Sequence, residues 1–109
     1  MQDISITITD RNGQIHEIQA PTDMNLNLME VIRMYELAEE GTIGICGGMA
    51  MCASCQCYVL NDVLKTERNE NEEAMLSEAY YVKPNSRLGC QINITSNIEG
   101  LSIEIAPEQ

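Results

Sequence analysis

Hydrophobic and polar residues alternate near both ends of the chain. Isoleucine alternates with polar residues over residues 2–9, and residues 101–105 repeat this period of two. Such alternation predicts a half-buried strand at each place. Residues 10–13 (DRNG) have the composition of a turn, with a glycine available for a positive φ. We therefore expect residues 14–20 to return as the second strand of a hairpin.

Two other segments have helical spacing. Pro21-Thr22-Asp23 is expected to open the first helix, with Thr22 or Asp23 as its cap. Its buried stripe is predicted to consist of Leu28, Val31, Ile32 and Tyr35. The second helix is expected over residues 70–80, with Asn69 and Glu72 in the pattern of a capping box. Its inward stripe is predicted to consist of Met75, Leu76, Ala79 and Tyr80.

Residues 56–60 and 88–94 are expected to form two more strands, with a polar connection at 61–68. Two hairpin strands, a helix and further strands predict an α+β architecture with one helix packed across a mixed sheet. The order of elements is compatible with a β-grasp (ubiquitin-like) fold. A chain of 109 residues suffices for one core, so a single domain over 1–109 is expected.

One carboxylate of the second helix falls on its inward face. At about 100° per residue, Glu72 lies within the arc of the hydrophobic stripe. A buried carboxylate needs a partner, and Arg87 is available for it. We therefore predict a buried ion pair between Glu72 and Arg87. Glu70 and Glu73 lie on the outer side, where they are free to meet another protein.

The chain is strongly acidic, with a net charge of −11 from 6 basic and 17 acidic residues. This charge argues against nucleic acid and anionic membranes as partners and favours a basic protein surface. No apolar run approaches the roughly 20 residues that a membrane helix needs. No signal-peptide pattern is present at the N-terminus, so a cytoplasmic location is expected.

Five cysteines carry the candidate chemistry, and four of them lie close together in the sequence. Cys46, Cys52 and Cys55 form a C-x5-C-x2-C pattern, and Cys90 follows at a distance. An odd, clustered set in a reducing compartment indicates metal or redox chemistry rather than disulfides. Four thiolates can bind the two irons of one [2Fe-2S] cluster, which makes these four residues the predicted ligands.

The loop around the first three ligands, residues 41–55 (GTIGICGGMAMCASC), suits this task. Its glycines allow backbone N–H groups to bend toward sulfur, and its small residues allow close wrapping. Met49 and Met51 are expected to shield sulfide from water. Cys57 is expected to be a small buried hydrophobic residue, with a functional thiol as the alternative.

Other cysteine sites fit less well. Structural zinc sites usually pair two short cysteine knuckles, whereas the second half here is the single Cys90. A thioredoxin-like Cys52-x-x-Cys55 would open a helix, but strand-like residues follow it. A Rieske centre needs two histidines, and His16 is the single histidine of the chain.

The cysteine spacing and residues 83–92 (KPNSRLGCQI) together resemble the vertebrate-type [2Fe-2S] ferredoxins, which include adrenodoxin, putidaredoxin and bacterial iron–sulfur-assembly ferredoxins. The resemblance runs from about residue 3 to residue 106. It implies the β-grasp fold and single-electron transfer from an NAD(P)H-dependent ferredoxin reductase to an acceptor. That acceptor could be a cytochrome P450, another oxygenase or the iron–sulfur assembly machinery. The resemblance also supports the Glu72–Arg87 pair.

The chain departs from this family pattern at Gln56, where the family commonly has a histidine that ties the cluster loop to the rest of the chain. Charge pattern and resemblance together predict that a basic surface of the reductase docks on Glu70 and Glu73, helped by Glu67 and Asp62. No nucleophile–base pair or phosphate-binding loop is recognisable, so an electron carrier is expected rather than an enzyme. A cluster-containing accessory or sensor protein is the alternative.

Overall fold

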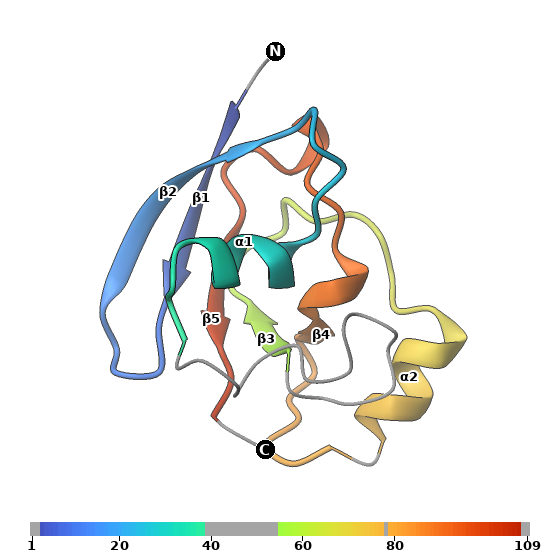
Figure 1. Ribbon diagram of the computed structural model, residues 1–109. Helices are drawn as coiled ribbons and strands as arrows, with labels where there is room; N and C mark the ends of the chain where they lie inside the picture. The colour runs from blue at the N-terminus through green and yellow to red at the C-terminus, as the bar shows by residue number, and fades with distance from the viewer. Residues whose placement is uncertain (1–2, 39–54, 78, 108–109) are drawn as a thin grey trace.

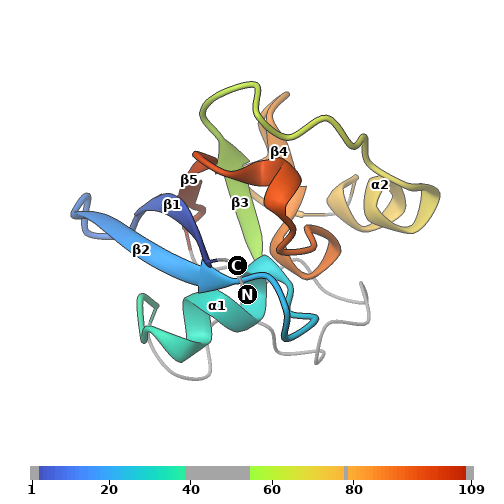
Figure 2. The same ribbon diagram turned by 90° about the horizontal axis from the view of Figure 1, so that it is seen from above.

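The structure is a computed structural model that describes residues 3–38, 55–77 and 79–107. In chain order its elements are β1 (Asp3–Thr9), β2 (Ile15–Pro21), α1 (Leu28–Met34), β3 (Gln56–Val59), α2 (Glu70–Leu76), β4 (Ser86–Leu88), two short 3-10 helices η1 (Gly89–Gln91) and η2 (Ser96–Ile98), and β5 (Ser102–Ile105). The strands form one mixed sheet, across which α1 packs, while α2 lies beside the β4 edge (Figures 1 and 2).

The order of the strands in the sheet is β2-β1-β5-β3-β4. β1 and β5 are parallel, and the other neighbouring pairs are antiparallel. The strands nearest the two chain ends therefore lie side by side at the centre of the sheet. Residues Gln56 and Leu88 pair directly across β3 and β4, so this edge joins two segments that are far apart in the sequence.

The expected hairpin is confirmed. Ile4, Ile6 and Ile8 of β1 face the core, and β2 returns antiparallel to it. Gly13 closes the turn at φ +85°, a left-handed conformation that glycine adopts without steric cost. The alternation at residues 101–105 is confirmed as well, because Leu101, Ile103 and Ile105 are buried.

The start of the first helix was predicted too early. Pro21 ends β2, and α1 begins only at Leu28 with Asn27 as its N-cap. Asn27 and Glu30 form a reciprocal capping box, with an Asn27 Oδ1 to Glu30 N distance of 2.9 Å and a Glu30 Oε1 to Asn27 N distance of 3.0 Å. The Asn-x-x-Glu spacing was the sequence signal for this start. The Leu28 N–H also donates to the Ile92 carbonyl, which holds the helix end against a distant segment.

Two stripe residues were placed wrongly. Leu28, Val31 and Ile32 are buried as expected, but Tyr35 is 43% exposed and its hydroxyl donates to the Gln19 carbonyl. Tyr80 is 69% exposed, because α2 ends at Leu76 rather than at residue 80.

The segment 88–94 is not one strand, as its apolar pattern predicted. β4 covers Ser86–Leu88, and the chain then turns into the 3-10 helix Gly89–Gln91. This turn brings Gly89 to the carbonyl oxygen of Cys55, directly before β3. In the described part of the chain, no helix has the length and apolar character needed to cross a membrane.

Candidate metal centre

Two of the four predicted ligands come together at the β3–β4 edge. Cys55 directly precedes β3, and Cys90 lies in η1, directly after β4. The Gly89 N–H donates to the Cys55 carbonyl oxygen over 2.8 Å, and the two thiols are within hydrogen-bond contact. Both residues are buried. The other two predicted ligands and the loop methionines, Cys46, Cys52, Met49 and Met51, lie outside the described residues.

Gly89 has no room for a side chain at this junction. A Cβ atom there would lie 3.2 Å from the Cys55 carbonyl oxygen and 3.3 Å from the Met29 nitrogen of α1. Both neighbours are backbone atoms inside the packed core, so neither can rotate away. The glycine therefore permits the close approach of the Cys90 segment to Cys55.

We expect Gly89→Ala to destabilise the fold by about 1–3 kcal/mol, because overpacking a core forces backbone shifts. For a chain of this size that lowers the thermal midpoint by roughly 4–12 °C. Thermal unfolding followed by circular dichroism measures the change. An alanine variant that melts like the wild type would mean that α1 and η1 can separate freely.

The chemistry of the two thiols suits a thiophilic cation. The hydrogen bond with Cys90, together with burial, raises the pKa of Cys55 above its usual range. Its buried thiol therefore gives up its proton less readily than a free cysteine does. A bound iron would supply positive charge and displace the proton, because coordinating thiols are deprotonated outright. The donor set therefore fits an iron–sulfur group.

Side chains and backbone around Cys90 are held by the predicted ion pair. Arg87 Nε donates to Glu72 Oε2 over 2.7 Å and Arg87 Nη2 donates to Glu72 Oε1 over 3.2 Å. Glu72 Oε2 also accepts the Leu88 N–H at 2.8 Å, and Arg87 Nη1 donates to the Thr66 carbonyl at 2.8 Å. Glu72 is fully buried and Arg87 is 7% exposed, so the prediction of a buried pair is confirmed.

This pairing changes the expected cap of α2. The Asn69 side chain accepts the Glu72 N–H at 2.8 Å, as an N-cap does. The Glu72 carboxylate, which would complete a capping box, points instead to Arg87 and Leu88. The helix is thereby fastened to β4 through its first turn.

Comparison with known proteins identifies the family. The chain is 33% identical over 104 residues to a 2Fe-2S ferredoxin of Rickettsia bellii. The matched region covers 94% of this chain and 89% of the Rickettsia protein. The chain belongs to the [2Fe-2S] ferredoxins. These are electron-transfer proteins rather than enzymes, and they carry a single [2Fe-2S] cluster. No protein-family model matches the chain.

Further similarities place this ferredoxin with the adrenodoxin and putidaredoxin group. It is 30% identical over 104 residues to the mitochondrial adrenodoxin-like protein 1 of Drosophila melanogaster. The matched region covers 94% of this chain and 58% of the length of the Drosophila protein. Its structure matches putidaredoxin in the covalent putidaredoxin reductase–putidaredoxin complex, with a TM-score of 0.78, 31% identity and coverage of 96% and 99% of the two chains. The predicted β-grasp ferredoxin fold is thus confirmed.

Gln56 ties β3 of this ferredoxin to the chain beyond α2. Its amide Nε2 donates to the Tyr80 carbonyl over 2.9 Å, and its Oε1 accepts the Ser86 hydroxyl at 2.8 Å. The Tyr58 hydroxyl adds a third link by donating to the Tyr81 carbonyl over 2.6 Å. A buried amide with two side-chain hydrogen bonds therefore stands where the family pattern commonly has a histidine.

Cys57 lies inside the sheet, where it pairs in register with Arg87 of β4 and Ile105 of β5. It is completely buried, which raises the pKa of its thiol to about 12 even though Arg87 lowers it. The expectation of a buried, hydrophobic cysteine is confirmed.

His16 is half-buried in β2, and its Nε2 atom lies 2.8 Å from Asp10 Oδ2. This hydrogen bond lowers the pKa of the Asp10 carboxyl.

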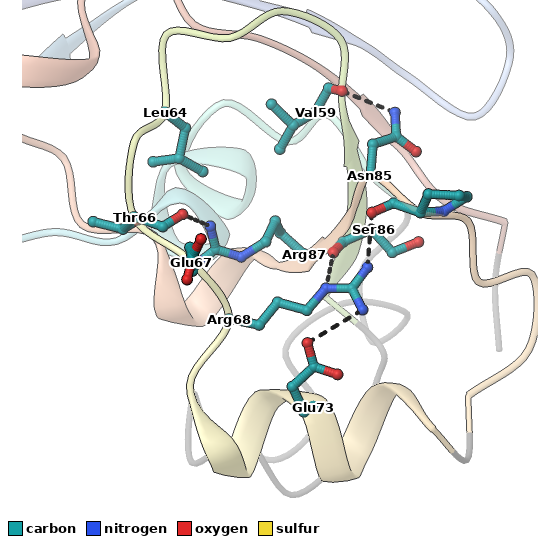
Figure 3. A pocket seen from close by; sticks show the side chains of 10 residues that line it. Val59, Leu64, Thr66, Glu67, Arg68, Glu73, Asn85, Ser86 and Arg87 are labelled. Atoms are coloured by element: carbon teal, nitrogen blue, oxygen red, sulfur yellow. Dashed lines mark hydrogen bonds and ion pairs between the residues drawn. The ribbon is translucent and has the colours of Figure 1, made fainter.

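The four predicted docking residues, Glu70, Glu73, Glu67 and Asp62, are all exposed. One of them is partly neutralised: Glu73 lies 3.6 Å from Arg68, whose guanidinium also binds the carbonyls of Ser86, Lys83 and Pro84. Figure 3 shows Arg68 between the Ser86 carbonyl oxygen and Glu73. Arg68 and Glu73 line a cavity of about 440 Å3. No ion pair joins the other three carboxylates to a described residue. Arg68 was not among the residues predicted from the sequence.

Proposed function

We propose that this ferredoxin carries single electrons from an NAD(P)H-dependent ferredoxin reductase to an acceptor such as a cytochrome P450 or another oxygenase. Cys46, Cys52, Cys55 and Cys90 hold its cluster in this proposal. The observation that carries it is the burial of Cys90 in contact with Cys55, although the two are remote in sequence. Their contact supports these two as residues that would hold the same cluster.

The cluster, when bound, supplies a one-electron redox couple. The protein's own part is to hold the ligands and limit solvent access to them. The Gly89–Cys55 hydrogen bond holds the segments of Cys55 and Cys90 together, and the Glu72–Arg87 pair fastens β4, which precedes Cys90, to α2. Clustered thiols are preserved in a reducing compartment, and we place the function in the cytoplasm on that ground.

The acidic surface at α2 supports a reductase as the electron donor. Putidaredoxin, which is similar to this chain, forms a complex with putidaredoxin reductase. Opposite charges raise the rate of encounter more than the final affinity, which suits a shuttle that visits two partners in turn. In this proposal Glu70, Glu67 and Asp62 provide the attraction, and Glu73 contributes less because Arg68 neutralises part of its charge.

A coupled assay tests the proposal. The cluster-loaded protein is mixed with NADH or NADPH, a panel of ferredoxin reductases that includes putidaredoxin reductase, and cytochrome c as the final acceptor. Cytochrome c reduction that requires both the reductase and this protein supports the carrier. A protein that a reductase reduces but that passes no electron on would instead support a sensor or accessory role.

Reduction by the best reductase is expected to slow steeply between 0.1 M and 1 M salt, where the Debye length falls from about 10 Å to about 3 Å. Glu70→Lys with Glu73→Lys should slow it about tenfold or more at low salt and leave the visible spectrum intact. Stopped-flow absorbance measures both effects.

The matched control is Glu17→Lys with Asp23→Lys. These residues are exposed on β2 and in the β2–α1 connection, so the pair gives the same change in net charge away from α2. If both double variants slow the reaction equally, only the net charge matters. A rate that is independent of salt would place docking on an apolar surface elsewhere.

A further inference from the structure

A chain of hydrogen bonds connects the N-terminus of α2 to a proposed ligand sulfur. Gln91, directly after Cys90, donates its amide Nε2 to Cys90 Sγ over 3.4 Å. The other end of the same amide, Oε1, accepts Asn69 Nδ2 at 3.0 Å. Asn69 is the N-cap of α2, and its Oδ1 accepts the Glu72 N–H at 2.8 Å. In this series of three hydrogen bonds, the partner of one amide atom fixes which way the other atom of the same amide points.

The direction of the Gln91 amide is decided by Asn69. The Asn69 Oδ1 atom is committed to the helix N-terminus, so the Nδ2 atom must face Gln91. Facing a donor, Gln91 presents Oε1, and its NH2 group is then directed at the Cys90 sulfur. The helix cap therefore selects the amide orientation in which Gln91 acts as a donor to sulfur rather than as an acceptor.

A donor at this position has a defined electronic effect. Reduction adds negative charge to the cluster and its thiolates, and hydrogen bonds to the sulfurs are one of the levers that set the potential of such centres. A hydrogen bond that strengthens as sulfur becomes more negative favours the reduced state. Cys90 is only 6% exposed, so water competes poorly for this sulfur.

We propose that Gln91 is a positioning residue that raises the reduction potential of the cluster through Cys90, and that Asn69 holds it in the orientation required. This inference rests on the proposed function, because it takes Cys90 to be a ligand. It also joins the ligand sulfur to the surface proposed for the reductase, since Asn69 directly precedes Glu70.

The test is a redox titration of the cluster-loaded protein, followed by visible absorbance. Gln91→Leu should lower the reduction potential, so that the ratio of reduced to oxidised protein at a fixed applied potential falls about threefold. The effect is modest because the hydrogen bond to sulfur exists in both redox states, and only its difference in strength between them affects the potential. Asn69→Asp should lower it as well. A carboxylate offers only acceptors, so it attracts the Gln91 NH2 group away from the sulfur.

Two features separate this effect from other causes. Aspartate caps a helix as well as asparagine does, so Asn69→Asp should melt no lower than the wild type. Asn71→Asp is the matched control, because it adds the same charge at an exposed position of α2 two residues away. The potential should fall further in Asn69→Asp than in Asn71→Asp.

Equal shifts in the two aspartate variants would overturn the inference, because charge alone would then explain them. An unchanged potential in Gln91→Leu would overturn it too, and that variant leaves the cap of α2 intact. A wild-type protein that binds no cluster would overturn the proposed function itself, whereas a normal cluster with unshifted variants contradicts only the role of Gln91.

Discussion

Cys90→Ser is expected to lose most of the cluster. Cys90 supplies the proposed ligand from the segment beyond β4, in contact with Cys55, and a hydroxyl is a poor substitute for a thiolate toward iron. Changes in the outer shell of a metal site already cost 10–100-fold, so we expect a loss of more than about tenfold in cluster retention. Serine at Cys46, Cys52 or Cys55 should act in the same direction.

Three measurements follow the cluster. The wild-type protein should be red-brown, its visible absorption should bleach on one-electron reduction, and the reduced form should give a spin-half EPR signal. Iron and acid-labile sulfide are expressed per folded protein, so that a loss of stability is not mistaken for a loss of ligand.

Cys57→Ser is the control for this prediction. Cys57 belongs to the same short segment but lies inside the sheet, beside Arg87 and Ile105. Burying a hydroxyl there lowers stability, yet the folded fraction should keep its cluster. Equal loss of iron from the Cys57 and Cys90 variants would refute the ligand assignment.

Glu72→Gln, which removes one negative charge, should strongly lower the free energy of unfolding. The carboxylate is fully buried and accepts from Arg87 and from the Leu88 N–H. Removing one partner of a buried ion pair costs about 3–5 kcal/mol, a large part of the 5–15 kcal/mol typical of a domain. The thermal midpoint should fall by roughly 12–20 °C, and cluster loss on warming should become faster.

Glu70→Gln provides the matched comparison, because Glu70 lies in the same turn of α2 and is exposed. We expect its midpoint to change little, as surface substitutions usually alter stability by about 0.5 kcal/mol or less. If Glu70→Gln melts early while Glu72→Gln melts like the wild type, the energetic role has been assigned to the wrong face.

The double variant Glu72→Met with Arg87→Met separates charge from hydrogen bonding. Replacing both members of a buried pair by apolar residues is often neutral. Here the Leu88 N–H and the Thr66 carbonyl would lose their partners, so only part of the stability should return. Full recovery would mean that these two backbone groups find other partners.

The features that the sequence determined by itself are those with a local period or a local chemistry. Alternation placed Ile4, Ile6 and Ile8 of β1 in the core, because successive strand residues face opposite sides. Helical periodicity placed Glu72 inward, and the cost of an unpaired buried charge then required Arg87. The cysteine spacing predicted the cofactor, because few sites other than an iron–sulfur cluster need four thiolates in this pattern.

Strand pairing and the details of the site were decided only by the tertiary structure. The parallel contact of β1 with β5 uses backbone groups that every residue carries, so no local pattern specifies it. An apolar run predicted a strand at 88–94, but the chain turns into η1 at Gly89, where the glycine packs against the backbone of Cys55 and of α1. The orientation of Gln91 likewise depends on Asn69, 22 residues away in the sequence. The ion pair of Arg68 with Glu73 joins residues five positions apart. Both contacts form only once the chain has folded.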